Sequence, residues 1–324
     1  HDRRSAEQTH GGIIMPLTIN TNNAAVQASY NLSRNQELLT RSMNRLASGK
    51  RIIDTSDDAG GLAIAMKLNS SIERLKGVNS NIKNATSYLD VQDGILQGAA
   101  GIIERMSELK SLSQDVLKNS ADIDTYNTEF KNLQVQLYQM SREKFNGVSL
   151  FATTTTKTGA TDAVFSENNS GTDNTVSIFT TENGATGPKV SLHKSVLLSA
   201  ITFDQSDVKT NKAWGSSGVK TLAASISSDT KDLSYFTTSF FSQAVENIAA
   251  LRAQNGGTMS RLDFALNNVD RTRSNLEASY GQIMDVDIAE ESTRLSKFQI
   301  LVQASASMLA QANMTPNAAM ILIG

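Results

Sequence analysis

Apolar residues recur at helical spacing near both ends of this chain of 324 residues. The N-terminal stripe comprises Leu32, Leu39, Met43 and Leu46, and the C-terminal stripe comprises Leu295, Phe298, Val302 and Leu309. Residues at steps of three, four and seven lie on one narrow face of a helix, which must be buried against a partner. We therefore expect the two ends to pair with one another or with another copy of the chain. The pattern favours assembly over catalysis.

Proline is nearly absent from the regions that carry this periodicity. The chain has three prolines, Pro16, Pro188 and Pro316. Because proline breaks the interior of a helix, both patterned regions are free to form very long helices. The expected helices cover about 24–48, a second stretch of about fifty residues that continues to Val116, a third that ends near Asn146-Gly147, and 287–313 before Pro316. A fifty-residue helix spans on the order of 75 Å, which is too long for one globular core.

The longest periodic stretches predict a coiled coil. Two polar residues at core-like positions, Asn79 and Thr86, set the register of this coil or face its less buried side. The sequence Asn255-Gly256-Gly257 lies between two further periodic stretches. The predicted core positions of the coil are Leu68, Ile72, Leu75, Ile82, Leu89, Met106, Leu133, Leu137, Leu262, Leu266, Val269 and Leu276.

Short polar motifs predict where the helices begin and end. Gly49 follows the first helix as its C-terminal cap. Ser56 or Asp57 is expected to cap the N-terminus of the next helix. Asp287 and Glu290 have the spacing of a capping box that opens the last helix.

The composition changes between about Phe151 and Asp232, where Thr, Ser, Gly, Asn and Asp predominate. Short β-like runs occur at 175–181, 189–192 and 200–203, with turn residues between them. We expect a small, exposed, β-rich insert. Its hydroxyl groups could carry O-linked glycans, although a solvated variable surface is the simpler interpretation.

Together these features predict a mainly α protein. A long coiled-coil helical bundle is formed by the N- and C-terminal regions, with the β-rich insert at the centre. The expected divisions are an N-terminal extension that we interpret as a tag or start-site artefact, a domain of the chain ends, a coiled-coil domain and the insert. Their bounds are 1–15, then 16–56 with 285–324, then 57–150 with 233–284, and 151–232.

Composition argues against several classes of function. The 30 Lys and Arg residues nearly balance the 32 Asp and Glu residues, so no basic footprint for nucleic acid is expected. Cysteine is absent and only three histidines occur, which leaves no nucleophile and base pair. No apolar run reaches membrane-spanning length. We expect no enzyme, no cofactor, no metal and no membrane insertion.

The carboxylates Asp285, Asp287, Glu290 and Glu291 form one acidic cluster. They could bind a metal or act as an acid–base pair. We favour capping and compensation of the helix dipole, because acidic residues are typical of a helix N-terminus.

Short motifs near both ends match those of a known family. They are Ile19–Asn22, Asn44–Ile52, Asp57–Ala65, Phe145–Val148, Met284–Glu290 and Ala310–Asn313, the last followed by Pro316. In this order and at opposite ends of a chain, these motifs resemble bacterial flagellin.

The resemblance implies an architecture and a function. The first and last helices would form an inner domain that lines a filament, the longer helices a coiled-coil domain outside it, and the insert would project outward. Subunits would leave the cell through the flagellar type III export channel and polymerise into the filament used for swimming. Partners would be further copies of the chain, an export chaperone, and the cap and junction proteins. The two terminal stripes listed above would form the polymerisation interface.

Two other classes remain open at this point. A hook–filament junction protein resembles flagellin at both ends. A more distant alternative is a secreted, bundle-forming translocator with a membrane partner. The resemblance also implies a contact for a vertebrate innate-immune receptor, at Arg105 and Leu109. The Val-Gln that follows in the family is replaced by Ser111-Leu112, so we expect weak receptor activation at best.

Overall fold

The computed structural model describes residues 22–153, 164–165 and 175–323, with side chains through residue 314. The chain forms two compact units. Unit 1 comprises residues 1–68 and 278–324, and unit 2 comprises residues 69–277. Both boundaries fall inside long helices, ten residues or fewer from the helix ends, whereas the domains proposed from the sequence divide at 56/57 and 284/285.

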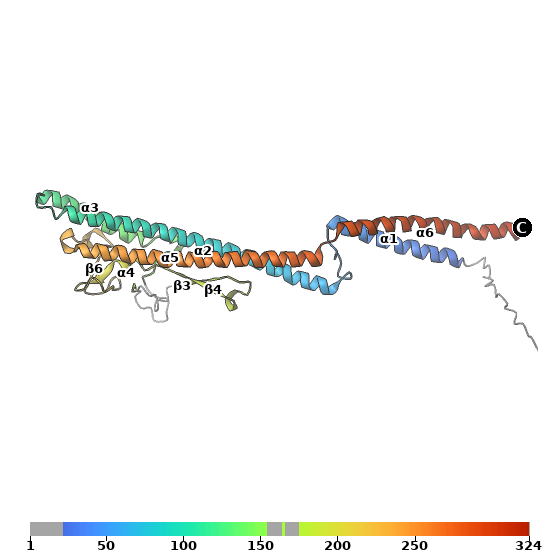
Figure 1. The fold of residues 1–324 in the computed structure, drawn as a ribbon, viewed down its shortest axis with the longest axis horizontal. Helices are drawn as coiled ribbons and strands as arrows, with labels where there is room; N and C mark the ends of the chain where they lie inside the picture. Colours follow the sequence, from blue (N-terminus) through green and yellow to red (C-terminus); the bar gives the residue numbers. More distant parts are fainter. Residues whose placement is uncertain (1–21, 154–163, 166–174, 324) are drawn as a thin grey trace, which may run out of the picture. The chain divides into compact units, whose positions relative to one another are not determined.

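Unit 1 is built around two helices from opposite ends of the chain, α1 (Asn23–Ser48) and α6 (Ile288–Ile323). They lie side by side (Figure 1). Gly49 ends α1 with a φ of 69°, the left-handed conformation expected of a C-terminal cap. Asp287 caps α6, because its Oδ1 accepts hydrogen bonds from the backbone N–H groups of Ala289 and Glu290 at 2.9 and 3.1 Å.

Unit 2 contains most of two long helices, α2 (Ala59–Leu112) and α5 (Thr238–Met284), together with α3 (Ser120–Met140). These three helices run alongside one another (Figure 1). Polar contacts show that α2 and α5 are antiparallel. The guanidinium group of Arg252 forms two 3.0 Å hydrogen bonds with Asp93. Asn79 donates to Asp270 at 2.7 Å, so this buried amide does join the two helices, as expected for a residue that sets register.

The structure buries or half-buries every position proposed for the coiled-coil core. Leu68, which belongs to unit 1, is half-buried, as are Leu133, Leu266 and Leu276. The fully buried positions are Ile72, Leu75, Ile82, Leu89, Met106, Leu137, Leu262 and Val269. The prediction of a mainly α fold with long helices is confirmed.

Among its described residues, unit 2 also contains three short antiparallel hairpins and several helical turns. The strands are β1 (Lys144–Phe145) with β2 (Val148–Ser149), β3 (Thr175–Phe179) with β4 (Lys189–His193), and β5 (Thr202–Asp204) with β6 (Val219–Thr221). The turns are η1 (Gly184–Thr186), α4 (Leu197–Ala200), η2 (Ser227–Asp229) and η3 (Leu233–Tyr235).

The insert contributes to the core of unit 2, so the expectation that it is simply exposed is wrong. Phe203 is fully buried and packs edge-on against Phe240 of α5, with 4.6 Å between ring centroids. Leu197, Ile201 and Leu222 are also fully buried. The reason lies in the apolar run around α4, which the polar composition of the insert as a whole conceals. Residues 154–163 and 166–174 of the insert lie outside the described residues.

Several predicted helix limits differ from the structure. α2 ends at Leu112 rather than at Val116, and α3 ends at Met140 rather than near Asn146-Gly147. Asn146 and Gly147 instead form the two-residue turn between β1 and β2, with φ values of 48° and 80°. Asn-Gly is the preferred sequence for such a turn because both residues take positive φ.

Two further differences concern the start of α2 and the end of α6. Asp58, rather than Ser56 or Asp57, caps α2, and its Oδ1 accepts a 2.8 Å hydrogen bond from the N–H of Gly61. α6 continues through Pro316 to Ile323. Pro316 cannot donate to the carbonyl of Ala312 one turn earlier. That carbonyl accepts a 2.6 Å hydrogen bond from the side chain of Asn22, which supplies it with a donor where proline cannot.

Among the described residues, no helix is both long and apolar enough to cross a membrane.

Candidate assembly interface

The seam between α1 and α6 follows a heptad pattern on both helices. On each helix the residues that face the partner are seven apart in two interleaved series. All are half-buried except Ser42 and Glu291, which are buried. The seam residues are Ala25, Ala28, Leu32, Asn35, Leu39, Ser42 and Leu46 on α1, and Glu291, Leu295, Phe298, Val302, Ser305, Leu309 and Ala312 on α6.

Polar contacts cross this seam. The hydroxyl group of Ser42 donates to the carboxylate of Glu291, and the amide of Asn35 donates to the hydroxyl of Ser305 at 2.8 Å. The same carboxylate lies 3.6 Å from the guanidinium group of Arg294. Because each polar group needs its own partner, a shifted alignment of the helices would leave these groups unpaired. The contacts therefore specify one antiparallel register.

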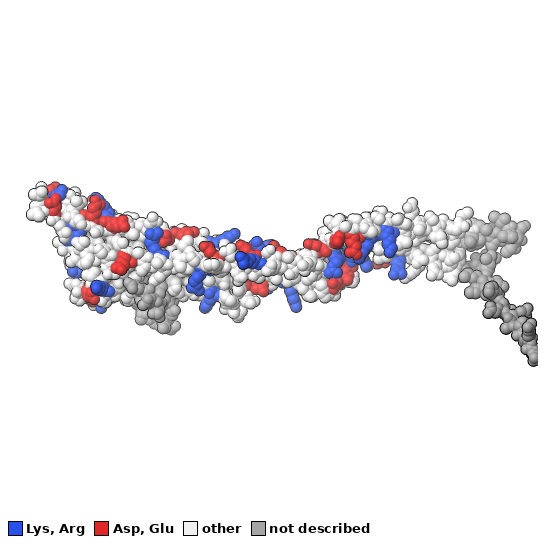
Figure 2. Space-filling model, viewed as in Figure 1, with Lys and Arg blue, Asp and Glu red and all other residues white. Residues whose placement is uncertain are grey.

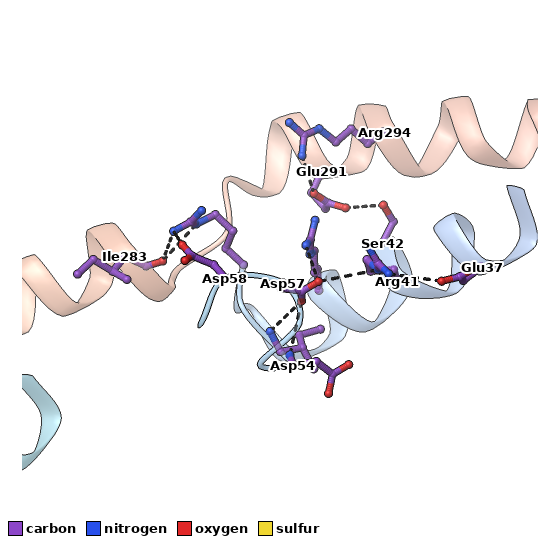
Figure 3. A network of polar contacts seen from close by, with 12 residues as sticks. Glu37, Arg41, Ser42, Asp54, Asp57, Asp58, Ile283, Glu291 and Arg294 are labelled. Carbon is purple, nitrogen blue, oxygen red and sulfur yellow. Dashed lines mark hydrogen bonds and ion pairs between the residues drawn. The ribbon is translucent and has the colours of Figure 1, made fainter. Parts of the chain in front are cut away.

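The loop after α1 folds back onto that helix through Asp57 (Figure 3). The carboxylate accepts hydrogen bonds from the N–H groups of Ile53 and Asp54 at 3.3 and 3.5 Å. It also lies 3.3 Å from the guanidinium group of Arg45 and 3.9 Å from that of Arg41. Burial by itself raises the pKa of Asp57, but these hydrogen bonds and the two arginines outweigh it and lower the pKa below 3.8.

The two connections that enter and leave the helix pair also join each other. The N–H of Arg51 donates to the carbonyl of Met284 at 2.6 Å, and the N–H of Val286 donates to that of Gly49 at 3.1 Å. The guanidinium group of Arg51 binds the carbonyl of Ile283 at 2.9 and 3.2 Å (Figure 3). This contact places a positive charge at the C-terminal end of α5, where the helix dipole favours it.

Large apolar side chains remain exposed on the helix pair. Met43, a predicted interface residue, is 48% exposed and lies outside the seam. Six further side chains are 62–67% exposed, namely Val26 and Tyr30 on α1 and Ile288, Ile300, Met308 and Met314 on α6. A groove of about 350 Å³ lies among Ala28, Asn31, Leu301, Ala304 and Met308, with Ala24, Gln27 and Ser305 also on its wall.

Much of the pair carries no charge. In the sequence no charged residue occurs between positions 22 and 33 or after Lys297. In Figure 2 the described surface of the helix pair towards the ends of the chain is accordingly white. An uncharged surface with exposed Ile, Met and Tyr side chains is suited to burial against protein.

Comparison with known proteins shows the family to which this chain belongs. The profile of the bacterial flagellin N-terminal helical region matches residues 19–156, and that of the bacterial flagellin C-terminal helical region matches residues 238–323. The chain is 30% identical over 301 residues to flagellin of Listeria innocua serovar 6a and 29% identical over 301 residues to flagellin of Listeria monocytogenes serovar 1/2a. Both alignments cover 93% of this chain and 97% of the relative. The chain belongs to the flagellin family.

A crystal structure of Bacillus cereus flagellin is also similar, with 22% identity and a TM-score of 0.39 over 62% of this chain and 94% of that chain. Flagellins are structural proteins that form the bacterial flagellar filament, an extracellular appendage used for motility. The relatives named here are flagellins, so the comparisons favour a filament subunit over the hook–filament junction protein. The resemblance noted from the sequence motifs is confirmed.

Within this flagellin the two residues proposed for the immune-receptor contact differ in exposure. Arg105 is accessible on α2, but its guanidinium group is paired with Glu129 of α3 at 2.7 and 3.1 Å and with Glu108 at 2.7 Å. Leu109 is fully buried in the core of unit 2. In this fold Leu109 presents no side-chain surface to a receptor.

The sequence reasoning missed the polar members of the seam. Glu291 lies four residues before Leu295, which is a heptad spacing. Asn35 and Ser42 lie three residues after Leu32 and Leu39, respectively. The heptad spacing thus indicates these polar positions as well, but a stripe defined by apolar residues alone does not include them.

Asp287 caps α6 and Glu290 lies in its first turn, as the capping interpretation expects, whereas Glu291 is buried and accepts the hydrogen bond from Ser42.

Proposed function

We propose that this flagellin polymerises through the α1–α6 pair of unit 1. In this proposal 16–56 and 285–324 form the inner layer that lines the filament, and 57–150 with 233–284 form the coiled-coil layer outside it. The insert, 151–232, faces outward. The interface residues named from the sequence stripes, except Met43, hold α1 against α6, and Met43 with the exposed apolar side chains contacts neighbouring subunits.

The contrast between the two units carries this proposal. Where the structure describes side chains, all of the largest fully buried ones, such as Phe130, Phe236 and Phe241, lie in unit 2. The seam of the α1–α6 pair is only half-buried along its apolar positions, because two helices cover one another on one side each. A neighbouring subunit that covers the remaining apolar surface would contribute about 1.5–3 kcal/mol for each large side chain that it buries completely.

Contacts of this kind can build a helical filament. A copy that binds through different surfaces on each side forms a heterologous contact, and such contacts generate open helical filaments when the rotation does not close a ring. A pair of helices with so little buried surface gains much of its order from these neighbours. Folding of α1 and α6 is thereby coupled to polymerisation.

The route to the filament follows from the family. We propose that the chain is exported through the flagellar type III channel, bound before export by a chaperone and placed beneath a cap protein on a filament seated on junction proteins. The absence of cysteine in the sequence is compatible with this route, since no disulfide can form during transit.

Deletion of residues 295–324 tests the role of α6. The truncated chain should remain a soluble monomer with unit 2 folded, because the partner of α1 is removed, and should form no filaments under negative-stain electron microscopy. Filaments from the truncated chain would contradict the proposal.

A point substitution tests the exposed face more finely. Ile300→Asp adds a charge to the uncharged surface of α6 without touching the core, so polymerisation should fail while the circular dichroism of the monomer is unchanged. Ile226→Asp is the matched control, because Ile226 is similarly exposed at 57% but lies in the insert. The control should polymerise normally. Equal loss in both variants would show that added charge, rather than position, is responsible.

We also propose that the immune receptor is engaged weakly. Burial of Leu109 and pairing of Arg105 with Glu129 support this. Full-strength activation of a receptor reporter cell line by purified monomer would refute it.

A further inference from the structure

Methionine is the only sulfur-containing residue in this chain. The sequence has ten methionines and no cysteine. Peroxides oxidise both thiolates and thioethers, and in this chain only thioethers are present for them to oxidise. Any reversible oxidation of sulfur in this protein takes place on methionine.

The exposed methionines are concentrated in unit 1. Met43, Met66, Met308 and Met314 are between 48 and 66% exposed. Within the described part of unit 2, Met106 is fully buried, whereas Met140 and Met259 are half-buried and pack against the core. A peroxide in solution thus has direct access to thioethers of unit 1 and much less access to those of unit 2.

Three of the exposed thioethers lie on the α1–α6 pair. Met43 is on α1, and Met308 and Met314 are on α6. Met308 also lines the 350 Å³ groove beside Leu301 and Ala304. Met66 differs, because it belongs to the first turns of α2. The three methionines of the pair occupy the surface that, under the proposed function, is covered by a neighbouring subunit.

We propose that Met43, Met308 and Met314 are three peroxide-sensitive modification sites that control assembly, an inference that rests on the proposed polymerisation surface. Hydrogen peroxide transfers one oxygen atom to each thioether. The sulfur lone pair forms the S–O bond, the O–O bond breaks, and water leaves, so that the thioether is oxidised by two electrons and the peroxide is reduced. A methionine sulfoxide reductase with a thiol reductant reverses the step.

Oxidation opposes assembly because it changes the polarity of the surface that must be buried. A sulfoxide oxygen is a strong hydrogen-bond acceptor, and burying it without a donor is unfavourable. Alanine and leucine side chains form much of the groove wall beside Met308, and Gln27, Asn31 and Ser305 form the rest. A neighbouring subunit that packs its own apolar side chains over Met308 supplies no donor to the sulfoxide. Once a subunit is in the filament, its neighbours shield the same thioethers, so the free subunit is the sensitive form.

The test treats the full-length monomer with graded hydrogen peroxide, removes the oxidant, and maps sulfoxides by peptide mass spectrometry. The critical concentration for polymerisation is then measured by sedimentation and electron microscopy. We expect sulfoxides first at the exposed positions and a critical concentration raised by about tenfold or more. Treatment with methionine sulfoxide reductases A and B should restore the original value. Preformed filaments treated identically should acquire fewer sulfoxides at the three positions.

Two variants separate these methionines from the rest. The triple variant Met43→Leu, Met308→Leu, Met314→Leu keeps the surface apolar and should polymerise after peroxide treatment as it does before. The matched control Met66→Leu removes an equally exposed thioether away from the pair and should stay sensitive. Met308→Gln, which places a polar group at the groove, should raise the critical concentration without peroxide.

The outcomes are distinct. Untreated protein that forms no filaments would remove the proposed function itself. A second outcome is that untreated protein forms filaments and that monomer carrying the three sulfoxides polymerises equally well. This result would overturn only the modification sites. A triple variant that stays as sensitive as the unsubstituted chain would overturn them as well, since the responsive residue would lie elsewhere.

Discussion

Ser42 of α1 donates a hydrogen bond to Glu291 of α6, and these two are the seam residues that the helix pair buries. The most deeply buried point of an otherwise half-buried apolar seam is therefore polar. We expect Ser42→Ala to weaken the pairing by about 1–3 kcal/mol, because it leaves a buried carboxylate with one partner fewer. The measurement is the thermal dissociation of filaments. Thr40→Ala is the control, since the exposed Thr40 hydroxyl bonds only within its own helix, to Gln36. Equal shifts in the two variants would contradict a role for the Ser42–Glu291 contact.

Asp57 should make the loop after α1 sensitive to acid. Its pKa is lowered in the folded chain, so its carboxylate stabilises the fold fully above the ordinary value of 3.8, and the stabilisation is lost as pH falls through the lower folded pKa. Hydrogen exchange of the Ile53 and Asp54 amides, corrected for intrinsic rates, should show protection that falls in this acid range. Asp57→Asn should reduce that protection at neutral pH and remove its acid dependence. A variant with the wild-type pH profile would refute the assignment.

The hydroxyl of Tyr88 should ionise only at high pH. Burial raises its pKa to about 12, and its hydroxyl donates to the carbonyl of Ser149 at 2.9 Å. The neutral form is favoured in the fold, so this contribution to stability is present below pH 10 and is lost as pH rises from 10 towards 12. Ultraviolet titration of the monomer should show a late tyrosine ionisation step near pH 12. Tyr88→Phe should abolish the late step and cost about 1 kcal/mol. A late step that persists in this variant would assign it to another tyrosine.

Phe203 tests whether the insert stabilises the helices. Phe203→Ala should destabilise the monomer by about 3–5 kcal/mol, because it leaves a cavity beside Phe240 in the core of unit 2. Phe179→Ala, in the same insert but 39% exposed, should have a much smaller effect. Urea unfolding followed by circular dichroism distinguishes them. Equal and small effects would return the insert to the role of an exposed appendage.

The helices were predictable because their periodicity repeats over many turns. The stripe from Leu32 to Leu46 and that from Leu295 to Leu309 placed α1 and α6 and their pairing, and the β3–β4 hairpin followed from its β-like runs and turn residues. Gly49 and Asp287 act as the caps that their sequence positions indicated. Local chemistry was sufficient in these places.

The remaining features depend on contacts between distant residues. Nothing near Pro316 indicates that α6 continues, because the donor to the Ala312 carbonyl is Asn22, 290 positions away in the chain. Burial of Phe203 likewise depends on α5. Gly256 and Gly257 do not interrupt α5, whose flanking turns are held by contacts such as that between Arg252 and Asp93.

The absence of charged residues beyond Lys297 has a consequence for the response to salts. Surface charges are screened by any electrolyte, but this part of the helix pair offers none to screen. Salts act there instead by being excluded from apolar surface, which strengthens burial for sulfate and phosphate. At equal ionic strength, the extent of polymerisation should therefore depend on the identity of the anion. Anions that are more strongly excluded from protein surfaces should promote polymerisation more.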